Sequence, residues 1–137
     1  MSALRRVHQR DWDNGDCGIA CVAMLARVSY EEALEAFRTL PGKAKGTSFF
    51  TTHTDIAQML AQFSIATKRV SFRSWRAIDR HAIVKVNPYQ SGRRWHWVVL
   101  DAGRDELVVH DPKPGKTHLI RDFRGLKGSG HFIAVAD

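Results

Sequence analysis

The sequence predicts an α+β fold, in which helices from the first half of the chain pack on a mostly antiparallel sheet formed by the second half. In the first half, apolar residues recur every three or four positions, as they do in helices. In the second half they alternate with polar residues, and short turns join neighbouring strands. The chain has 137 residues, of which 44% are hydrophobic, and this fits one domain spanning residues 1–137 around a buried core.

The first predicted helix covers residues 17–28 and is apolar on almost every side, which is typical of a buried helix. Residues 14–16 precede it, and we expect them to supply a turn and an N-cap. A second helix is predicted over residues 29–38, because Ser29 and Glu32 match the capping-box pattern.

A third helix is predicted over residues 54–63, started by Thr51 or Thr52. The strand of residues 82–86 is expected to stop before Pro88, because proline cannot donate a hydrogen bond within a sheet. The other predicted elements are a short helix over residues 75–80, strands over 65–70, 95–101, 106–111 and 131–136, and a short extended segment over 117–120.

The net charge is +7, with 21 lysines and arginines against 14 aspartates and glutamates. The basic residues are scattered and accompany no nucleic-acid-binding motif, so we expect a solvated basic surface and no nucleic-acid partner. An acidic substrate or an anionic surface also fits this charge. Neither a secretory signal nor a membrane-spanning run is predicted, and two cysteines make no disulfide framework. A reducing, cytoplasmic location is therefore expected, with signal-independent export left open.

Cys17 lies at the start of the predicted buried helix, where backbone N–H groups and the helix dipole favour a thiolate. Gly18 follows, and we expect its missing side chain to let a substrate carbonyl approach the sulfur. The alternative is that Cys17 is a small core residue, which is what we expect of Cys21 one turn further on. The helix start favours Cys17 as a candidate nucleophile.

His96 and Asp111 lie on two consecutive predicted strands. If the turn is centred between residues 103 and 104, paired residues have numbers that sum to 207, which places His96 opposite Asp111. A carboxylate in that position fixes the tautomer and orientation of an imidazole, although a purely structural His–Asp pair is the alternative. With Cys17 added, the set contains the nucleophile, the base and the orienting group of thiol catalysis.

Other chemistry-bearing residues are weaker candidates. His110 faces the opposite side of the sheet from Asp111 and is expected to be a packed polar residue. A metal site built from both cysteines, His96 and His110 matches no zinc spacing, so we predict no metal and no other cofactor. The four tryptophans are expected mostly in the core, with a cleft lining as the alternative.

The stretch of residues 16–25, which reads DCGIACVAML, resembles the nucleophile helix of the bacteriocin-processing cysteine peptidases, papain-like domains that remove double-glycine leader peptides. The likeness continues in order through further blocks at residues 46–48, 82–84, 96–100 and 109–112 and at Gly115. It covers nearly the whole chain, and the blocks together are fairly specific. The resemblance implies a papain-like fold with Cys17 as nucleophile, His96 as general base and acid, and Asp111 as the orienting carboxylate.

One departure from that family concerns the oxyanion hole, for which the family uses a glutamine usually six positions before the nucleophile. Here that position is Asp11, which cannot donate a hydrogen bond when ionised, and the nearest glutamine is Gln9. We expect Gln9 to take the role if residues 10–16 contain a two-residue bulge, with Asn14 as the fallback. No transporter domain follows in the sequence, so we do not expect the peptidase arm of an exporter.

The predicted function is hydrolysis of a peptide bond by a cysteine peptidase, with a peptide or protein as the partner and a Gly-Gly-type leader as one expected target. A deamidase or transglutaminase-like effector using the same triad is an alternative, because the chemistry of thiol acyl transfer is shared. A non-catalytic peptide-binding module and a basic nucleic-acid-binding domain are further alternatives. The shape of the cleft would distinguish the two catalytic alternatives, since a long groove favours a peptide and a narrow pocket favours a glutamine side chain.

Overall fold

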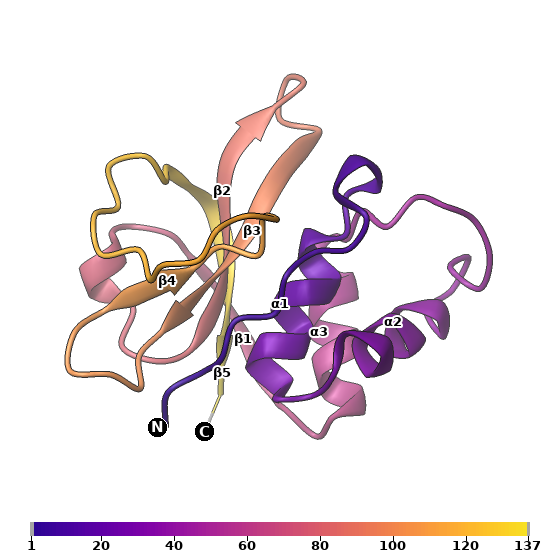
Figure 1. The fold of residues 1–137 in the computed structure, drawn as a ribbon, viewed down its shortest axis with the longest axis horizontal. Coiled ribbons are helices and arrows are strands. Elements are labelled where there is room, and N and C mark those ends of the chain that lie inside the picture. Colours follow the sequence, from indigo (N-terminus) through magenta and orange to yellow (C-terminus); the bar gives the residue numbers. More distant parts are fainter. Residues whose placement is uncertain (1, 137) are drawn as a thin grey trace.

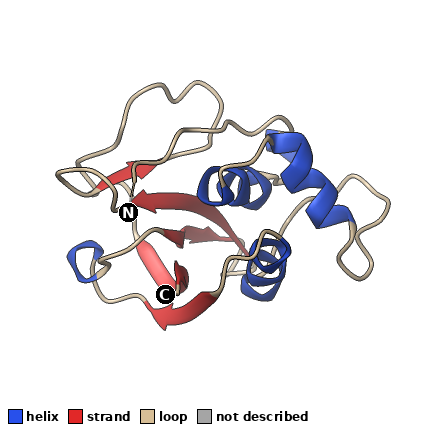
Figure 2. Cartoon of the chain, turned by 90° about the horizontal axis from the view of Figure 1, so that it is seen from below, coloured by secondary structure: helices blue, strands red, loops and turns tan. Residues whose placement is uncertain are grey.

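The computed structural model describes residues 2–136 and consists of three α-helices packed on one side of a five-stranded sheet (Figure 1, Figure 2). The helices are the 3-10 turn η1 (Trp12–Asn14), α1 (Cys17–Ala26), α2 (Tyr30–Arg38), α3 (His53–Gln62) and the 3-10 turn η2 (Trp75–Ala77). The strands are β1 (Thr67–Ser71), β2 (Ala82–Tyr89), β3 (Arg94–Asp101), β4 (Val108–His110) and β5 (Gly128–Val135). This arrangement confirms the predicted α+β class.

The helix α1 is the centre of the helical layer and packs on both α2 and β3. Its residues from Cys17 to Leu25 are all buried, as predicted from their apolar character. The helix ends at Ala26, earlier than predicted, because Arg27 adopts a left-handed conformation with φ 60° and closes the last turn.

The starts of the helices follow local capping rules, with one exception. Ser29 and Glu32 form the predicted capping box at α2, and a second box begins α3 behind Thr52. Asp16 is the N-cap residue of α1, within the predicted residues 14–16, but its side chain makes no capping bond there. That carboxylate instead accepts hydrogen bonds from two other segments, residues 9–11 and α2, which are described with the site below.

The sheet has the strand order β1-β5-β2-β3-β4, and all of its pairings are antiparallel. The predicted stop of β2 before Pro88 is wrong, since the strand continues to Tyr89. Its register with β3 shifts between Val86 and Tyr89, so the proline lies in an irregular stretch where no regular ladder bond is needed. The segment of residues 117–120 contributes only a bridge between Ile120 and Val109.

The predicted register between β3 and β4 is wrong by two residues. Leu100 pairs with Val109, so that paired numbers sum to 209. The cause is the Asp101 carboxylate, which accepts the Gly103 N–H at 2.9 Å and bends the chain into a longer loop, so that β4 begins only at Val108. A shift of two residues leaves every side chain on the predicted face of the sheet, because the side-chain period of a strand is two.

Both faces of the sheet are covered by apolar side chains. One cluster lies between the sheet and the helices, and a second lies on the far face beneath η2, which Figure 2 shows on the opposite side from the α-helices. Among residues 2–136, no helix combines the length and the apolar character needed to cross a membrane.

Candidate active site

Three of the predicted site residues meet where the helical layer contacts the sheet. Cys17 is the first residue of α1, His96 lies in β3, and Asp111 directly follows β4. The His96 Nε2 lies 2.7 Å from Asp111 Oδ1, and the same carboxylate oxygen accepts the Lys113 N–H at 2.9 Å. Because β4 ends at His110, Asp111 reaches His96 from the chain beyond the strand rather than from a position directly across the ladder.

The other side of the His96 ring faces the nucleophile. Burial alone lowers the pKa of His96, but hydrogen bonds from its ring to Asp111 and to Cys17, together with their charges, outweigh burial and raise the pKa to about 9. Because Nε2 is bonded to Asp111, Nδ1 is the nitrogen left for the thiol. Burial raises the pKa of Asp111, but the hydrogen bond to His96 and the charge of His96 lower it by more. The pKa of Asp111 is therefore below its usual value.

Gln9 lies in the same cleft, where it lines a cavity of about 260 Å³ together with Cys17 and His96. The side chain is buried, and its Nε2 donates to Asp16 Oδ1 at 2.9 Å. An amide nitrogen carries a second hydrogen, which remains for a group in the cleft. Its backbone N–H donates to Pro112 O at 2.8 Å, which ties Gln9 to the residue after Asp111.

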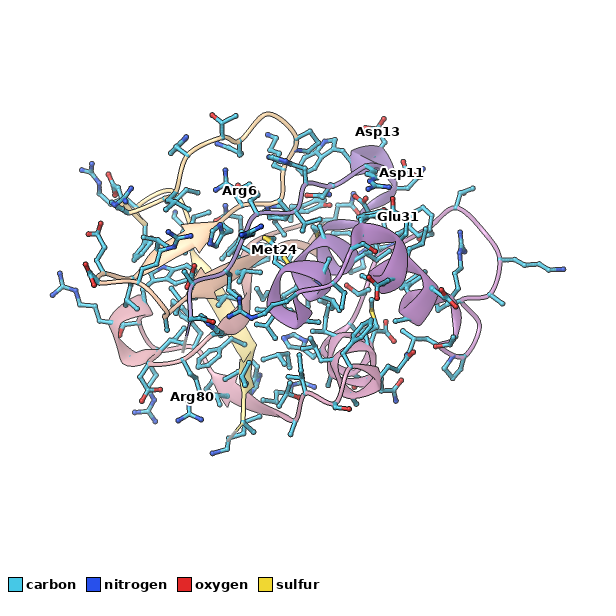
Figure 3. The ribbon with its side chains drawn as sticks, turned by 60° about the horizontal axis from the view of Figure 1, so that its bottom comes forward. Arg6, Asp11, Asp13, Met24, Glu31 and Arg80 are labelled. Atoms are coloured by element: carbon cyan, nitrogen blue, oxygen red, sulfur yellow. The ribbon has the colours of Figure 1, made fainter. Side chains whose placement is uncertain are left out.

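The extra residues between Gln9 and Cys17 form η1. Its turn is closed by Gly15, which has a φ of +79° and would place an added Cβ 2.4 Å from the Phe50 ring. Asp13, which lies at the outer end of this turn in Figure 3, is exposed and borders the same cavity. Asn14 donates its side-chain amide to Asp11 at 2.9 Å and is not among the residues that line the cavity, so the structure does not bring this fallback donor to the cleft.

Asp16 is a residue whose role near the site the sequence did not reveal. Its fully buried carboxylate accepts the Gln9 amide, the backbone N–H groups of Arg10 and Asp11 at 2.8 and 2.9 Å, and the Tyr30 hydroxyl at 2.7 Å. Burial and the bond to Asp16 raise the pKa of Tyr30, so the phenol stays protonated and donates. The only local signal was an acidic residue before a helix, which fits an ordinary N-cap equally well.

The structure explains the glycine at position 18 by helix packing, which differs from the predicted role of opening space for a substrate carbonyl. A Cβ at this position would lie 2.0 Å from Thr51 Oγ1 and 3.0 Å from Ile56, so the glycine lets α3 and the segment before it approach α1 closely. Cys21, one turn further along α1, is fully buried, as predicted for a core residue.

Two adjoining cavities open at Cys17. A second cavity of about 230 Å³ adjoins the first, and the two share Gly15, Cys17, Phe50 and Trp95 among their lining residues. Trp12 is 45% exposed and stands edge-on to His96, with 5.8 Å between the ring centroids. The expectation of core positions for most tryptophans is therefore wrong, because only Trp97 is buried, and the alternative of a cleft lining holds for Trp12, Trp95 and Trp97.

His110 belongs to a separate polar cluster. Its Nε2 lies 3.0 Å from Asp101 Oδ2, and burial lowers the pKa of His110 despite that carboxylate. The side chain is 1% exposed, in line with the expected packed polar residue. Among residues 2–136, no group of three or more His, Cys, Asp or Glu side chains is placed to hold a metal ion.

Comparison with known proteins agrees with this geometry. The fold is similar to a double glycine motif protease from an AMS/PCAT transporter, solved in complex with the leader peptide, at 14% identity and a TM-score of 0.63 over 96% of this chain and 90% of that one. It is also similar to the peptidase domain of Streptococcus mutans ComA, at 21% identity and a TM-score of 0.60 over 96% and 98% of the two chains. Among curated protein sequences, none matches significantly. The sequence profile of the Peptidase C39 family matches residues 5–123, and the chain therefore belongs to that family.

Proposed function

We propose that this member of the Peptidase C39 family cleaves peptide bonds by thiol acyl transfer, with Cys17 as nucleophile, His96 as proton carrier and Asp111 as the group that orients it. The observation that carries the proposal is the position of His96, which is hydrogen-bonded to the carboxylate on one side and to the thiol on the other. That arrangement keeps a protonated imidazole beside the sulfur, which is what a thiolate nucleophile and a departing amine both require.

The chemistry follows from the geometry in two steps. The Cys17 sulfur attacks the substrate carbonyl and forms a C–S bond, the C–N bond breaks, and His96 gives its proton to the leaving nitrogen. Water then attacks the thioester with His96 as base, which releases the acid and restores the thiol. The backbone N–H of Cys17, which lies in the first turn of α1, and the free hydrogen of the Gln9 amide would hold the oxyanion.

An elongated cleft supports a peptide as the substrate rather than a single glutamine side chain. The two adjoining cavities both open at Cys17 and differ in most of their other lining residues, and exposed aromatic side chains border one of them. A protease of similar fold was solved with its leader peptide, and we propose a Gly-Gly-type leader as the substrate class here as well. Two free cysteines fit a reducing compartment, so we propose that residues 1–137 act there, in the cytoplasm, as one peptidase domain.

The test uses a synthetic peptide that contains an internal Gly-Gly pair, with cleavage followed by mass spectrometry. We expect cleavage after the pair by the wild-type chain, none by Cys17→Ala, and near wild-type cleavage by the matched control Cys21→Ala. Iodoacetamide at neutral pH should alkylate Cys17 faster than a model thiol, and His96→Ala should remove that difference. Conversion of glutamine to glutamate without chain cleavage would replace the proposal with a deamidase, and a Cys17 no more reactive than the model thiol would remove the catalytic role.

A further inference from the structure

The cavity that His96 does not line has an unusual set of charged side chains. The cavity of about 230 Å³ is lined by Cys17 but not by His96, and three basic residues border it. Arg93 and Arg94 come from the β2–β3 hairpin, which projects beyond the sheet in Figure 1, and Lys43 comes from the loop after α2. Cations from the sheet and from the helical layer therefore converge on a cavity that opens at the nucleophile.

These three cations have no acidic partner among the described residues, since none takes part in an ion pair within residues 2–136. The one acidic residue among the described lining residues is Asp55, whose carboxylate already accepts the Thr52 N–H at 2.9 Å in the α3 capping box. With three cations and one carboxylate, the described lining of the cavity carries an excess of positive charge.

The two arginines are held in place rather than free in solvent. The Arg94 guanidinium lies 4.1 Å from the centroid of the Phe50 ring and donates to Arg93 O at 3.1 Å. Arg93 in turn donates its Nε to Gln90 O at 3.3 Å. An arginine that is already ordered loses less conformational freedom when it binds a carboxylate, so these contacts favour binding.

The proton transfer by His96 indicates which cavity receives which part of the substrate. His96 gives its proton to the leaving amine, so the leaving part of the substrate lies in the cavity that His96 lines. The adjoining cavity, which Cys17 lines but His96 does not, then receives the acyl part.

We propose that this acyl-side cavity selects substrates with a carboxylate side chain, from Asp or Glu, within the few residues that precede the cleaved bond, and that Arg93, Arg94 and Lys43 recognise it. The proposal rests on the proposed peptidase function and adds its substrate selectivity.

The test is a set of Gly-Gly peptides in which a single Glu is moved from the third to the sixth position before the bond and, as the reverse arm, along the first four positions after it. Each is compared with the Gln peptide of the same length. We expect kcat/KM about threefold to tenfold higher for Glu at one or more of the preceding positions, as for exposed charge pairs, and no such gain after the bond. At about 1 M salt, where the Debye length is about 3 Å, the preference should disappear.

Variants assign the effect to the cavity. Arg94→Gln and Arg93→Gln should lower the preference for Glu, and Arg94→Glu should replace it with a preference for Lys. The matched control is Arg73→Gln, which removes the same charge at an exposed position away from this cavity and should keep the wild-type preference. Equal kcat/KM for Glu and Gln peptides, or a preference that survives Arg94→Glu, would overturn the proposal.

Binding to Cys17→Ala separates this proposal from the peptidase function, because it needs no turnover. Tighter binding of the Glu peptide together with no cleavage by the wild-type chain would remove the peptidase function and keep the carboxylate site. Equal binding of Glu and Gln peptides would remove the carboxylate site even if both were cleaved. An oligonucleotide that displaces the Glu peptide with higher affinity would assign the cations to nucleic acid and overturn the proposal as well.

Discussion

Replacement of Asp111 by Asn tests how His96 is kept protonated. The raised pKa of His96, about 9 against an ordinary value of 6.5, corresponds to about 3 kcal/mol, since a tenfold change in proton binding is worth about 1.4 kcal/mol. Burial opposes this rise, and the carboxylate and the thiol together produce it. The amide of Asn keeps a hydrogen-bonding oxygen but carries no charge, so we expect the pKa of His96 in Asp111→Asn to fall toward 6.5 or below.

The consequence for catalysis depends on pH. At about pH 8, a histidine with a pKa of about 9 is about 90% protonated, and one with a pKa of about 6.5 is only about 3% protonated. We expect kcat/KM of Asp111→Asn to drop about tenfold or more at pH 8, with a smaller loss at pH 6, so that the alkaline limb of the pH–rate profile moves toward neutral pH.

The raised pKa of His96 also determines how the free energy of unfolding changes with pH. A group whose pKa is higher in the folded chain stabilises it fully below its unfolded value of 6.5, and this contribution disappears as pH rises through about 9. Denaturant unfolding of the wild-type chain should therefore show a loss of up to about 3 kcal/mol between these pH values, and Asp111→Asn should show little change.

The assays are the pH–rate profile, denaturant unfolding at both ends of the window, and NMR titration of the His96 ring. Titration in Cys17→Ala, with and without Asp111→Asn, isolates the contribution of the carboxylate. The matched control is Asp101→Asn, which removes the carboxylate beside His110 in the separate polar cluster and should leave the alkaline limb in place. An alkaline limb that stays near pH 9 in Asp111→Asn would refute the reasoning.

Three further outcomes are expected. Gln9→Ala should lower kcat by about 100-fold with little change in KM, because an oxyanion donor acts in the transition state. An equally large rise in KM would contradict this. Gly18→Ala should lower the free energy of unfolding by about 1–3 kcal/mol, since its Cβ would lie 2.0 Å from Thr51 Oγ1, and Thr51→Ala should restore part of the loss. Burial raises the pKa of Asp101, but hydrogen bonds from His110 and nearby N–H groups lower it to about 2, so its stabilisation is present above 3.8 and lost as pH falls through about 2. Acid denaturation of Asp101→Asn should therefore depend less on pH in this window than that of the wild-type chain.

Features determined by neighbours in sequence were predictable. The Ser29–Glu32 capping box depends on two residues that lie three positions apart. The burial of α1 follows from the apolar residues of the helix itself. The faces of β3 and β4 were also predictable, because a strand alternates with a period of two whatever its partner. His96 and Asp111 could therefore be expected on one face of the sheet, although the register between β3 and β4 could not be predicted.

Features determined by distant contacts were not predictable. The register of β3 and β4 depends on the Asp101 carboxylate, which also accepts the Leu4 N–H from the other end of the chain at 2.9 Å. The role of Asp16 depends on Tyr30 in α2 and on the segment that carries Gln9. In each case a buried carboxylate gathers donors from several segments, and no local pattern states which donors these are.

The placement of Gln9 has a consequence for the spacing of oxyanion donors in this chain. Two contacts hold the residue, one from its side chain to Asp16 and one from its backbone to Pro112. Asp16 immediately precedes Cys17, and Pro112 immediately follows Asp111, so Gln9 is tied directly to the residues next to the proposed nucleophile and the proposed orienting group. The number of residues between Gln9 and Cys17 then matters little, because η1 takes up the extra length at the rim of the cavity. Under the proposed mechanism, a donor eight residues before the nucleophile can thus take the role of one six residues before it, and Asp16→Ala should lower kcat as Gln9→Ala does.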